Sequence, residues 1–88
     1  MKDAKDKDGH SIKLLGRAGL IYWDKEEKYF IDSEMLIGSK FDIVVYSNSI
    51  RFYDRADNRL LPESKKKEII SVVIKLLLSA KIKADIQH

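Results

Sequence analysis

The residues suited to acid–base, nucleophilic or metal chemistry are few in this chain of 88 residues, and they lie apart. Its two histidines are His10, near the start, and His88, the last residue, so neither is expected in a preorganised pocket. Asp32 and Glu34 are close in sequence, but such a pair at a strand end is more typical of a turn or cap than of an acid–base couple. We therefore expect no enzymatic activity and no metal site.

Thiol and phosphate-loop chemistry are equally unsupported. The chain has no cysteine, which excludes a disulfide framework, a thiolate nucleophile and a cysteine-based zinc site. Gly16 and Gly19, in "GRAG", precede a predicted strand, whereas the glycines of phosphate-binding loops precede a helix. We expect no cofactor.

The composition is typical of one soluble globular domain, with 44% hydrophobic and 35% charged residues. The start, "MKDAKDKDGH", alternates lysine and aspartate, so we expect a mobile tail over residues 1–10 and a single domain over 11–88. The longest apolar stretch, Ile69 to Leu78, contains Lys75 and is shorter than the roughly 20 residues of a membrane span. We expect a cytoplasmic protein that does not enter a membrane.

Alternating and aromatic-rich segments predict strands in the first two thirds of the chain. A short edge strand is expected at 12–15, and a hairpin at 18–23 and 28–32 around the turn "DKEE". A second hairpin is expected in "FDIVVYSNSIRFYD", with a two-residue turn at Ser47 and Asn48. Residues 55–59, "RADNR", read as a loop.

A helix is expected to follow, because Pro62 suits a first helical turn and the apolar period then changes to that of a helix. The predicted buried stripe consists of Ile69, Ile70, Val73, Leu76, Leu77 and Ala80. The alternating segment "KIKADI" then predicts a closing strand. These elements predict an α+β fold of order ββββαβ, with an antiparallel or mixed sheet of four to five strands and one helix packed on one face.

The predicted registers sort the side chains onto two faces. In the first hairpin Tyr22 lies opposite Tyr29 and Trp23 lies opposite Lys28. In the second, the two-residue turn pairs Val45 with Ile50 and Ile43 with Phe52. We then place all four tyrosines on one face and Trp23, Phe30 and Phe52 on the other. Because a tyrosine hydroxyl favours water or a partner, we expect the tyrosine face to be open and the helix to cover the other.

The open face is the predicted partner-binding surface, because tyrosine and arginine are favoured at binding hot spots and contiguous exposed apolar patches mark interaction sites. The candidate residues are Tyr22, Tyr29, Tyr46, Arg51 and Tyr53. Two other interpretations remain open. The tyrosines are also favoured on solvent-facing strands by their β propensity alone, and two copies of the chain can pack through this face as a homodimer.

A nucleic-acid-binding or regulatory domain is the alternative function. Tyr46, Arg51 and Tyr53 interleave rings with a cation, as surfaces that stack single-stranded bases do. The net charge of +3 is smaller than is typical of nucleic-acid binders. The lysines Lys65 to Lys67 lie between Glu63 and Glu68, a pattern that favours a solvated helix start over a phosphate-binding patch.

Three segments in succession carry a family resemblance: "GLIYWDKEEKYFIDSEML", "FDIVVYSNSIRFYD" and "LPESKKKEIISVVIKLLLSAKIKADI". Over residues 17–87 the chain resembles the small bacterial immunity proteins of polymorphic toxin systems, immunity family seventy-four. The resemblance implies a protein-binding module that neutralises a cognate toxin domain by direct contact. Such a protein requires a compact scaffold with one complementary surface and no catalytic group.

Overall fold

The computed structural model describes residues 3–53 and 61–87 and confirms the α+β class. The predicted loop at 55–59 lies outside the described residues. The elements are β1 (Asp3–Lys5), β2 (His10–Leu14), β3 (Ala18–Asp24), β4 (Glu27–Met35), β5 (Ile43–Tyr46), the short 3₁₀ helix η1 (Ser47–Ser49), β6 (Arg51–Phe52), α1 (Glu63–Ser79) and β7 (Ala84–Gln87).

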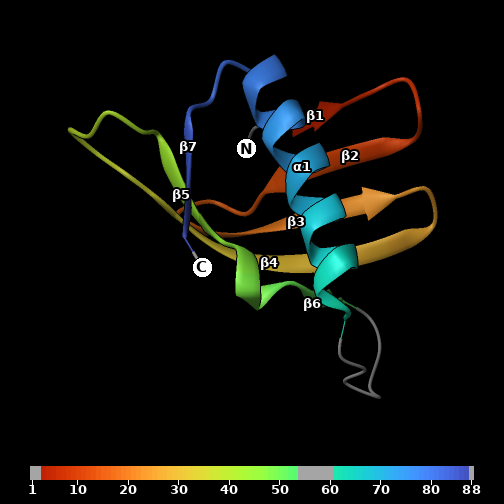
Figure 1. Ribbon diagram of the computed structural model, residues 1–88. Helices are drawn as coiled ribbons and strands as arrows, with labels where there is room; N and C mark the ends of the chain where they lie inside the picture. Colours follow the sequence, from red (N-terminus) through yellow and green to blue (C-terminus); the bar gives the residue numbers. More distant parts are fainter. Residues whose placement is uncertain (1–2, 54–60, 88) are drawn as a thin grey trace.

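All described strands belong to one mixed sheet (Figure 1). The order is β1-β2-β3-β4-β5-β7, with β6 also paired to β4, so the described sheet has seven strands rather than the four to five predicted. Every pair is antiparallel except β5 and β7. Strand β4 is the longest, and it pairs with β3 along one edge and with both β5 and β6 along the other.

The expected tail is wrong for residues 3–10, which form a β-hairpin instead. Strand β1 pairs with β2, and Ala4 opposite Ile12 packs against the core. In the turn, a carboxylate oxygen of Asp6 accepts hydrogen bonds from the backbone N–H groups of Asp8 and His10, both at 2.9 Å. The strand was missed because an edge strand of lysine and aspartate carries almost no apolar pattern.

The register of the first hairpin is confirmed. Trp23 lies opposite Lys28 and Tyr22 opposite Tyr29. The turn itself is one pair tighter than expected, because Asp24 and Glu27 also pair and leave two residues between them. Lys25 takes a positive φ of 58°, which suits the twist of a two-residue hairpin turn.

The second hairpin is wrong, because β5 and β6 do not pair with each other. Both pair with β4, and η1 separates them along its edge. A two-residue hairpin turn requires positive φ, and none of Ser47, Asn48 and Ser49 adopts it. The hydroxyl of Ser49 instead donates to the Tyr46 carbonyl at 2.6 Å and accepts from the Asp32 N–H at 2.7 Å, which ties η1 to β4.

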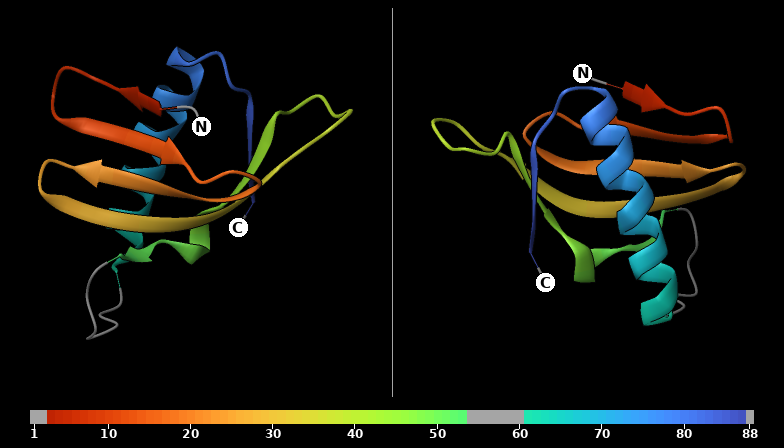
Figure 2. Two further views of the ribbon diagram at one scale, coloured as in Figure 1. Left: turned by 180° about the vertical axis from the view of Figure 1, so that it is seen from behind. Right: turned by 45° about the horizontal axis from the view of Figure 1, so that its top comes forward.

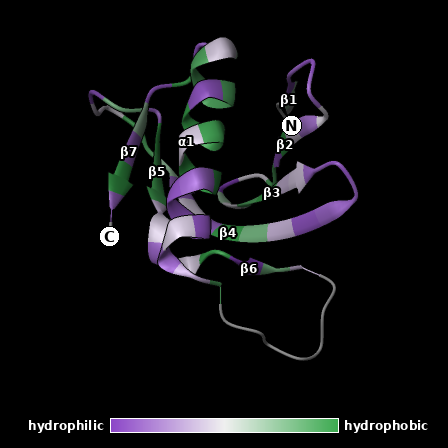
Figure 3. Ribbon diagram, turned by 45° about the vertical axis from the view of Figure 1, so that its right-hand side comes forward, coloured by the Kyte–Doolittle hydropathy of each residue, from purple (hydrophilic) through white to green (hydrophobic). Residues whose placement is uncertain are grey.

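Helix α1 lies across one face of the sheet, as predicted (Figure 2). Pro62 is its N-cap residue, and Ile69, Ile70, Val73, Leu76 and Leu77 are buried. The described part of the chain contains no helix long and apolar enough to cross a membrane. The predicted closing strand is β7. Figure 3 shows hydrophobic and hydrophilic residues alternating along α1, whereas β5 is largely hydrophobic and the β3–β4 turn is hydrophilic.

The covered face is the opposite of the one expected for the first hairpin. Tyr22 is 1% exposed and Tyr29 is 3% exposed, so both lie in the core beneath α1. Their predicted exposure is therefore wrong, whereas the outer positions of Tyr46, Arg51 and Tyr53 are confirmed. The strand residues that belong to this hydrophobic core are Ile12, Leu14, Leu20, Tyr22, Tyr29, Ile31, Ile43 and Val45.

Aromatic rings stack side by side beneath the helix. The ring centroids of His10 and Tyr22 are 6.2 Å apart, those of Tyr22 and Tyr29 are 5.9 Å apart, and those of Tyr29 and Phe52 are 5.2 Å apart. This ladder crosses β2, β3, β4 and β6. Burial, with the negative charges of Asp24 and Asp6, raises the pKa of the Tyr22 phenol, so the hydroxyl remains neutral.

We expect Tyr22→Ala to lower the free energy of unfolding by about 3 kcal/mol, because it removes a ring from a packed core. Urea denaturation followed by circular dichroism measures the change. The matched control is Tyr46→Ala, which removes a ring that is 36% exposed and should change stability by less than about 1 kcal/mol. Equal effects of the two substitutions would contradict the assignment of faces.

Candidate functional site on the outer face of the sheet

The face of the sheet turned away from α1 carries a group of partly exposed rings and cations. We call this group the outer aromatic array, and it consists of Trp23 from β3, Lys28 and Phe30 from β4, Arg51 from β6, and Tyr53. Cross-strand register brings it together, because Trp23 lies opposite Lys28 and Phe30 lies opposite Arg51. None of the described elements covers this face.

Each cation of the array lies over a ring. The Lys28 Nζ is 4.1 Å from the centroid of Tyr53 and 5.7 Å from that of Trp23. The Arg51 Cζ is 4.6 Å from the centroid of Phe30, whose ring in turn stacks on Tyr53 at 6.2 Å. Cation–π contacts of this kind contribute about 0.5–1 kcal/mol each at exposed sites, so they orient the five side chains as one surface.

The position of the Phe30 ring depends on Gly19. This glycine has a φ of +86°, and a Cβ atom there would lie 2.8 Å from the Phe30 Cζ. The absence of a side chain therefore lets the ring lie against the backbone of β3, next to the irregularity between Ala18 and Leu20.

One end of the outer face is cationic. Lys5 and Lys13 occupy outer positions on β1 and β2, and together with Lys28 they surround Trp23. None of these three lysines forms an ion pair with a residue that the structure describes. Ser11, opposite Trp23, is small, and a hollow of about 450 Å³ lies over it, bounded by Lys5, Lys13 and Trp23.

The other end is acidic. Arg51 forms an ion pair with Asp32 at 3.2 Å, with both side chains about half exposed, and Glu34 follows two residues later on the same face. A second hollow of about 370 Å³, lined by Phe30 and Tyr46 among others, separates Tyr46 from the array. Tyr46 therefore borders the outer aromatic array without joining it.

The five predicted site residues thus separate into two groups. Tyr22 and Tyr29 are core residues, whereas Arg51 and Tyr53 belong to the array and Tyr46 lies beside it. Sequence reasoning missed three members of the array. The predicted register of the first hairpin could have identified them. It placed Lys28 opposite Trp23, and a face that holds a lysine is a poor candidate for the face under the helix.

The Lys65–Lys67 cluster is largely compensated by acids. The Lys65 Nζ lies 3.7 Å from Asp24 and 3.9 Å from Glu68, and the Lys66 Nζ lies 3.8 Å from Glu63. The Lys65 and Lys66 side chains are only 32% and 17% exposed, so this part of the helix start is ion-paired and less solvated than predicted.

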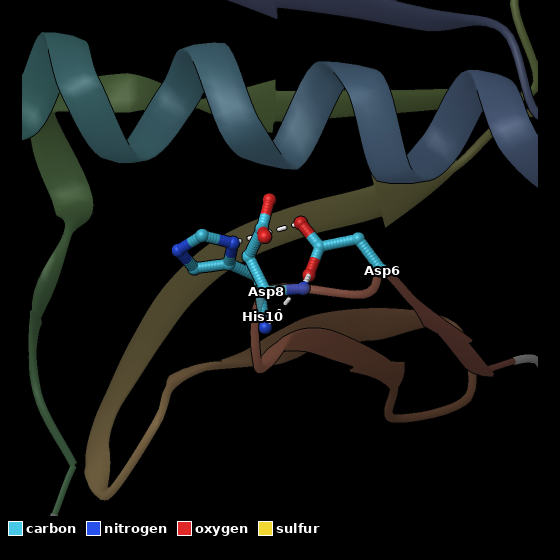
Figure 4. A group of neighbouring side chains, drawn as sticks. All are labelled: Asp6, Asp8 and His10. Atoms are coloured by element: carbon cyan, nitrogen blue, oxygen red, sulfur yellow. Dashed lines mark hydrogen bonds and ion pairs between the residues drawn. The ribbon is translucent and has the colours of Figure 1, made fainter.

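Asp6, Asp8 and His10 lie together at the β1–β2 turn (Figure 4). One oxygen of Asp6 accepts the two backbone N–H groups of the turn, and the other lies 2.7 Å from the His10 Nδ1. The His10 Nε2 lies 3.4 Å from an oxygen of Asp24. The Asp6 carboxylate is therefore engaged on both oxygens, and the cluster closes the turn and links it to β3.

Asp6 should make the stability sensitive to acid. Burial opposes its ionisation, but hydrogen bonds from the His10 backbone and ring and from the Asp8 backbone outweigh it, so the pKa of Asp6 is lowered from 3.8. A carboxyl group whose pKa is lowered on folding stabilises the folded state above that ordinary value, and the contribution is lost as the pH falls through the folded-state pKa. We expect Asp6→Asn to reduce the fall in urea midpoint between about pH 5 and pH 2.

The control for this prediction is Asp8→Asn in the same turn, since no hydrogen bond from a described residue ends on the Asp8 carboxylate. Its urea midpoint should follow that of the unmodified protein over the same pH range. An Asp6→Asn profile parallel to the other two would show that Asp6 does not contribute.

Gly19→Ala should disturb the outer aromatic array. We expect it to lower the free energy of unfolding by more than about 1 kcal/mol, because the new methyl group is strained at positive φ and meets the Phe30 ring. Gly16→Ala is the matched control, since it has a φ of +76° with nothing within 4 Å of the added Cβ. Equal losses of stability, measured by urea denaturation, would show that the Phe30 contact is unimportant.

A second exposed apolar group lies at the β4–β5 connection, which projects from the sheet (Figure 1). Ile37 is 99% exposed, Met35 is 42% exposed and Phe41 is 38% exposed. Among the described residues, the cation–π contacts involve the outer aromatic array and not this group.

Comparisons with protein-family models, with curated proteins and with solved structures found no match.

Proposed function

We propose that this protein is a binding module that recognises another protein through the outer face of its sheet. The outer aromatic array is the observation that carries the proposal. Trp23, Phe30 and Tyr53 stay partly exposed in a small domain, and Lys28 and Arg51 hold them in place. Aromatic residues and arginine are the side chains most enriched at the energetic centres of protein interfaces.

The scaffold suits recognition by a rigid surface. The array side chains alternate along the strands with core residues, since Tyr22 and Tyr29 are buried directly behind them. A surface held by packed strands loses little conformational entropy on binding, which favours affinity.

Neutralising a bacterial toxin is the role that the family resemblance implies, and we adopt it as part of the proposal. A blocking protein requires a stable scaffold and a complementary surface, and it acts by occupying its target rather than by catalysis. The proposal therefore includes a cytoplasmic protein without enzymatic activity, whose partner is a toxin domain.

Nucleic acid is a less favourable partner for this surface. Bases stack on open ring faces, whereas Lys28 lies over Tyr53 and Arg51 lies over Phe30. Two of the lysines at the start of α1, which would add phosphate contacts, are paired with acids: Lys65 with Asp24 and Glu68, and Lys66 with Glu63. Both observations weaken the alternative that the sequence left open.

The test is partner capture with the full-length protein and with a Trp23→Ala, Tyr53→Ala variant, each immobilised and exposed to native lysate after nuclease treatment. We expect one protein to bind the unmodified chain and to lose at least about tenfold in affinity for the variant, as removal of two hot-spot rings does. Expression of the captured protein should then arrest growth, and co-expression of this chain should restore it.

The matched control is Ile37→Ser, which removes an exposed apolar side chain far from the array and should leave capture unchanged. Circular dichroism melts establish that each variant is folded. A folded Trp23→Ala, Tyr53→Ala variant that captures the same protein equally well would contradict the proposal.

A further inference from the structure

The cationic end of the outer face indicates what kind of protein surface it fits. We propose that the partner presents an acidic segment there, with carboxylates at Lys5, Lys13 and Lys28 and an apolar side chain in the hollow beside Trp23. This inference rests on the proposed function and specifies the chemistry of its partner.

The charges around Trp23 indicate an acidic partner. Three cations of the described chain are paired with acids: Arg51 with Asp32, Lys65 with Asp24 and Lys66 with Glu63. Lys5, Lys13 and Lys28 form no such pair with a described residue, although they lie around one side chain, Trp23. At this end of the face the three cations stand against one acidic position, Asp3 opposite Lys13, so the net charge is positive and steers and orients a negatively charged partner.

The hollow beside Trp23 indicates that the partner segment also contains an apolar side chain. It lies over Ser11 and is bounded by Lys5, Lys13 and Trp23, so one wall is an indole ring and the rim is cationic. An apolar side chain that enters it would be packed against the indole, while carboxylates beside that side chain in sequence would reach the lysines. The site therefore fits a segment in which acidic and apolar residues alternate, rather than a uniformly charged polymer.

The acidic end of the same face makes the recognition directional. Asp32 and Glu34 lie on the far side of the array from Lys5 and Lys13, so an acidic segment is attracted to one end and repelled from the other. Phosphates would experience the same repulsion, but they would gain nothing from the apolar wall of the hollow.

The test uses a short fluorescein-labelled peptide of alternating glutamate and leucine, and fluorescence anisotropy at low salt. The comparison probes are the same peptide with lysine in place of glutamate, and labelled single-stranded oligothymidylate. We expect the glutamate peptide to bind, the lysine peptide not to bind, and Lys13→Glu to weaken the glutamate peptide about tenfold. Lys40→Glu, an exposed lysine in the β4–β5 connection with the same charge change, should alter binding less than about twofold.

Three outcomes overturn the inference. Equal effects of Lys13→Glu and Lys40→Glu would show that only net charge matters. Tighter binding of oligothymidylate than of the glutamate peptide, lost in Lys13→Glu, would identify nucleic acid as the ligand. Self-association in sedimentation velocity that Lys13→Glu abolishes and the added charge change Glu34→Lys restores would identify a second copy of the chain.

Failure of this inference is distinguishable from failure of the proposed function. If Lys13→Glu captures the lysate protein as well as the unmodified chain does, but the Trp23→Ala, Tyr53→Ala variant does not, the face binds a protein that is not acidic. If neither variant changes capture, the outer face is not the binding surface at all.

Discussion

The pairing of β4 is the constraint on which the rest of this structure depends. This strand joins β3 on one edge and both β5 and β6 on the other, so its register decides which side chains of the two halves share a face. Ser33 opposite Val45 and Tyr29 opposite Phe52 place the apolar residues of both halves on one side. A single helix can cover only that side, and α1 does so with a stripe of five buried residues.

The outer aromatic array is a consequence of this arrangement. Tyr22 and Tyr29 lie in the core. Their neighbours along the strands, Trp23, Lys28 and Phe30, must therefore face outward, because successive side chains of a strand alternate. Gly19 then provides the space for the Phe30 ring, and β6 adds Arg51 over it. The candidate binding surface and the core thus lie on opposite faces of the same sheet, and both depend on one strand register. A substitution that shifts this register alters both.

Local patterns predicted much of this fold. The helix stripe, the closing strand and the pairing of Tyr22 with Tyr29 follow from periodicity and from one short turn, and all are confirmed. Local patterns did not predict how the strands before and after residue 40 pair with each other. That depends on the pairing of β4 with both β5 and β6, which no local pattern specifies. Without that pairing, the polarity of tyrosine was used to choose the open face, and the choice was wrong for Tyr22 and Tyr29.

The missed parts of the site have similar causes. The sequence Ser47-Asn48-Ser49 lacks the glycine typical of a tight hairpin turn, and η1 forms there instead. Strand β1 has too little apolar character to be recognised, so the contribution of Lys5 to the outer face was hidden. Arg51 and Tyr53 were placed on the outer face by the polarity of tyrosine, whereas an argument from the charge of Lys28 would also have identified Trp23.

The central claim, that the face around Trp23 is where a partner binds, has one direct measurement. Trp23 is the sole tryptophan of the chain, so its fluorescence reports this face alone when a partner without tryptophan is added. We predict that acrylamide quenches Trp23 in the free protein and that the captured partner, in a tryptophan-free form, protects it from quenching as it saturates the protein. Saturable binding that leaves both the emission and the quenching of Trp23 unchanged would contradict the account.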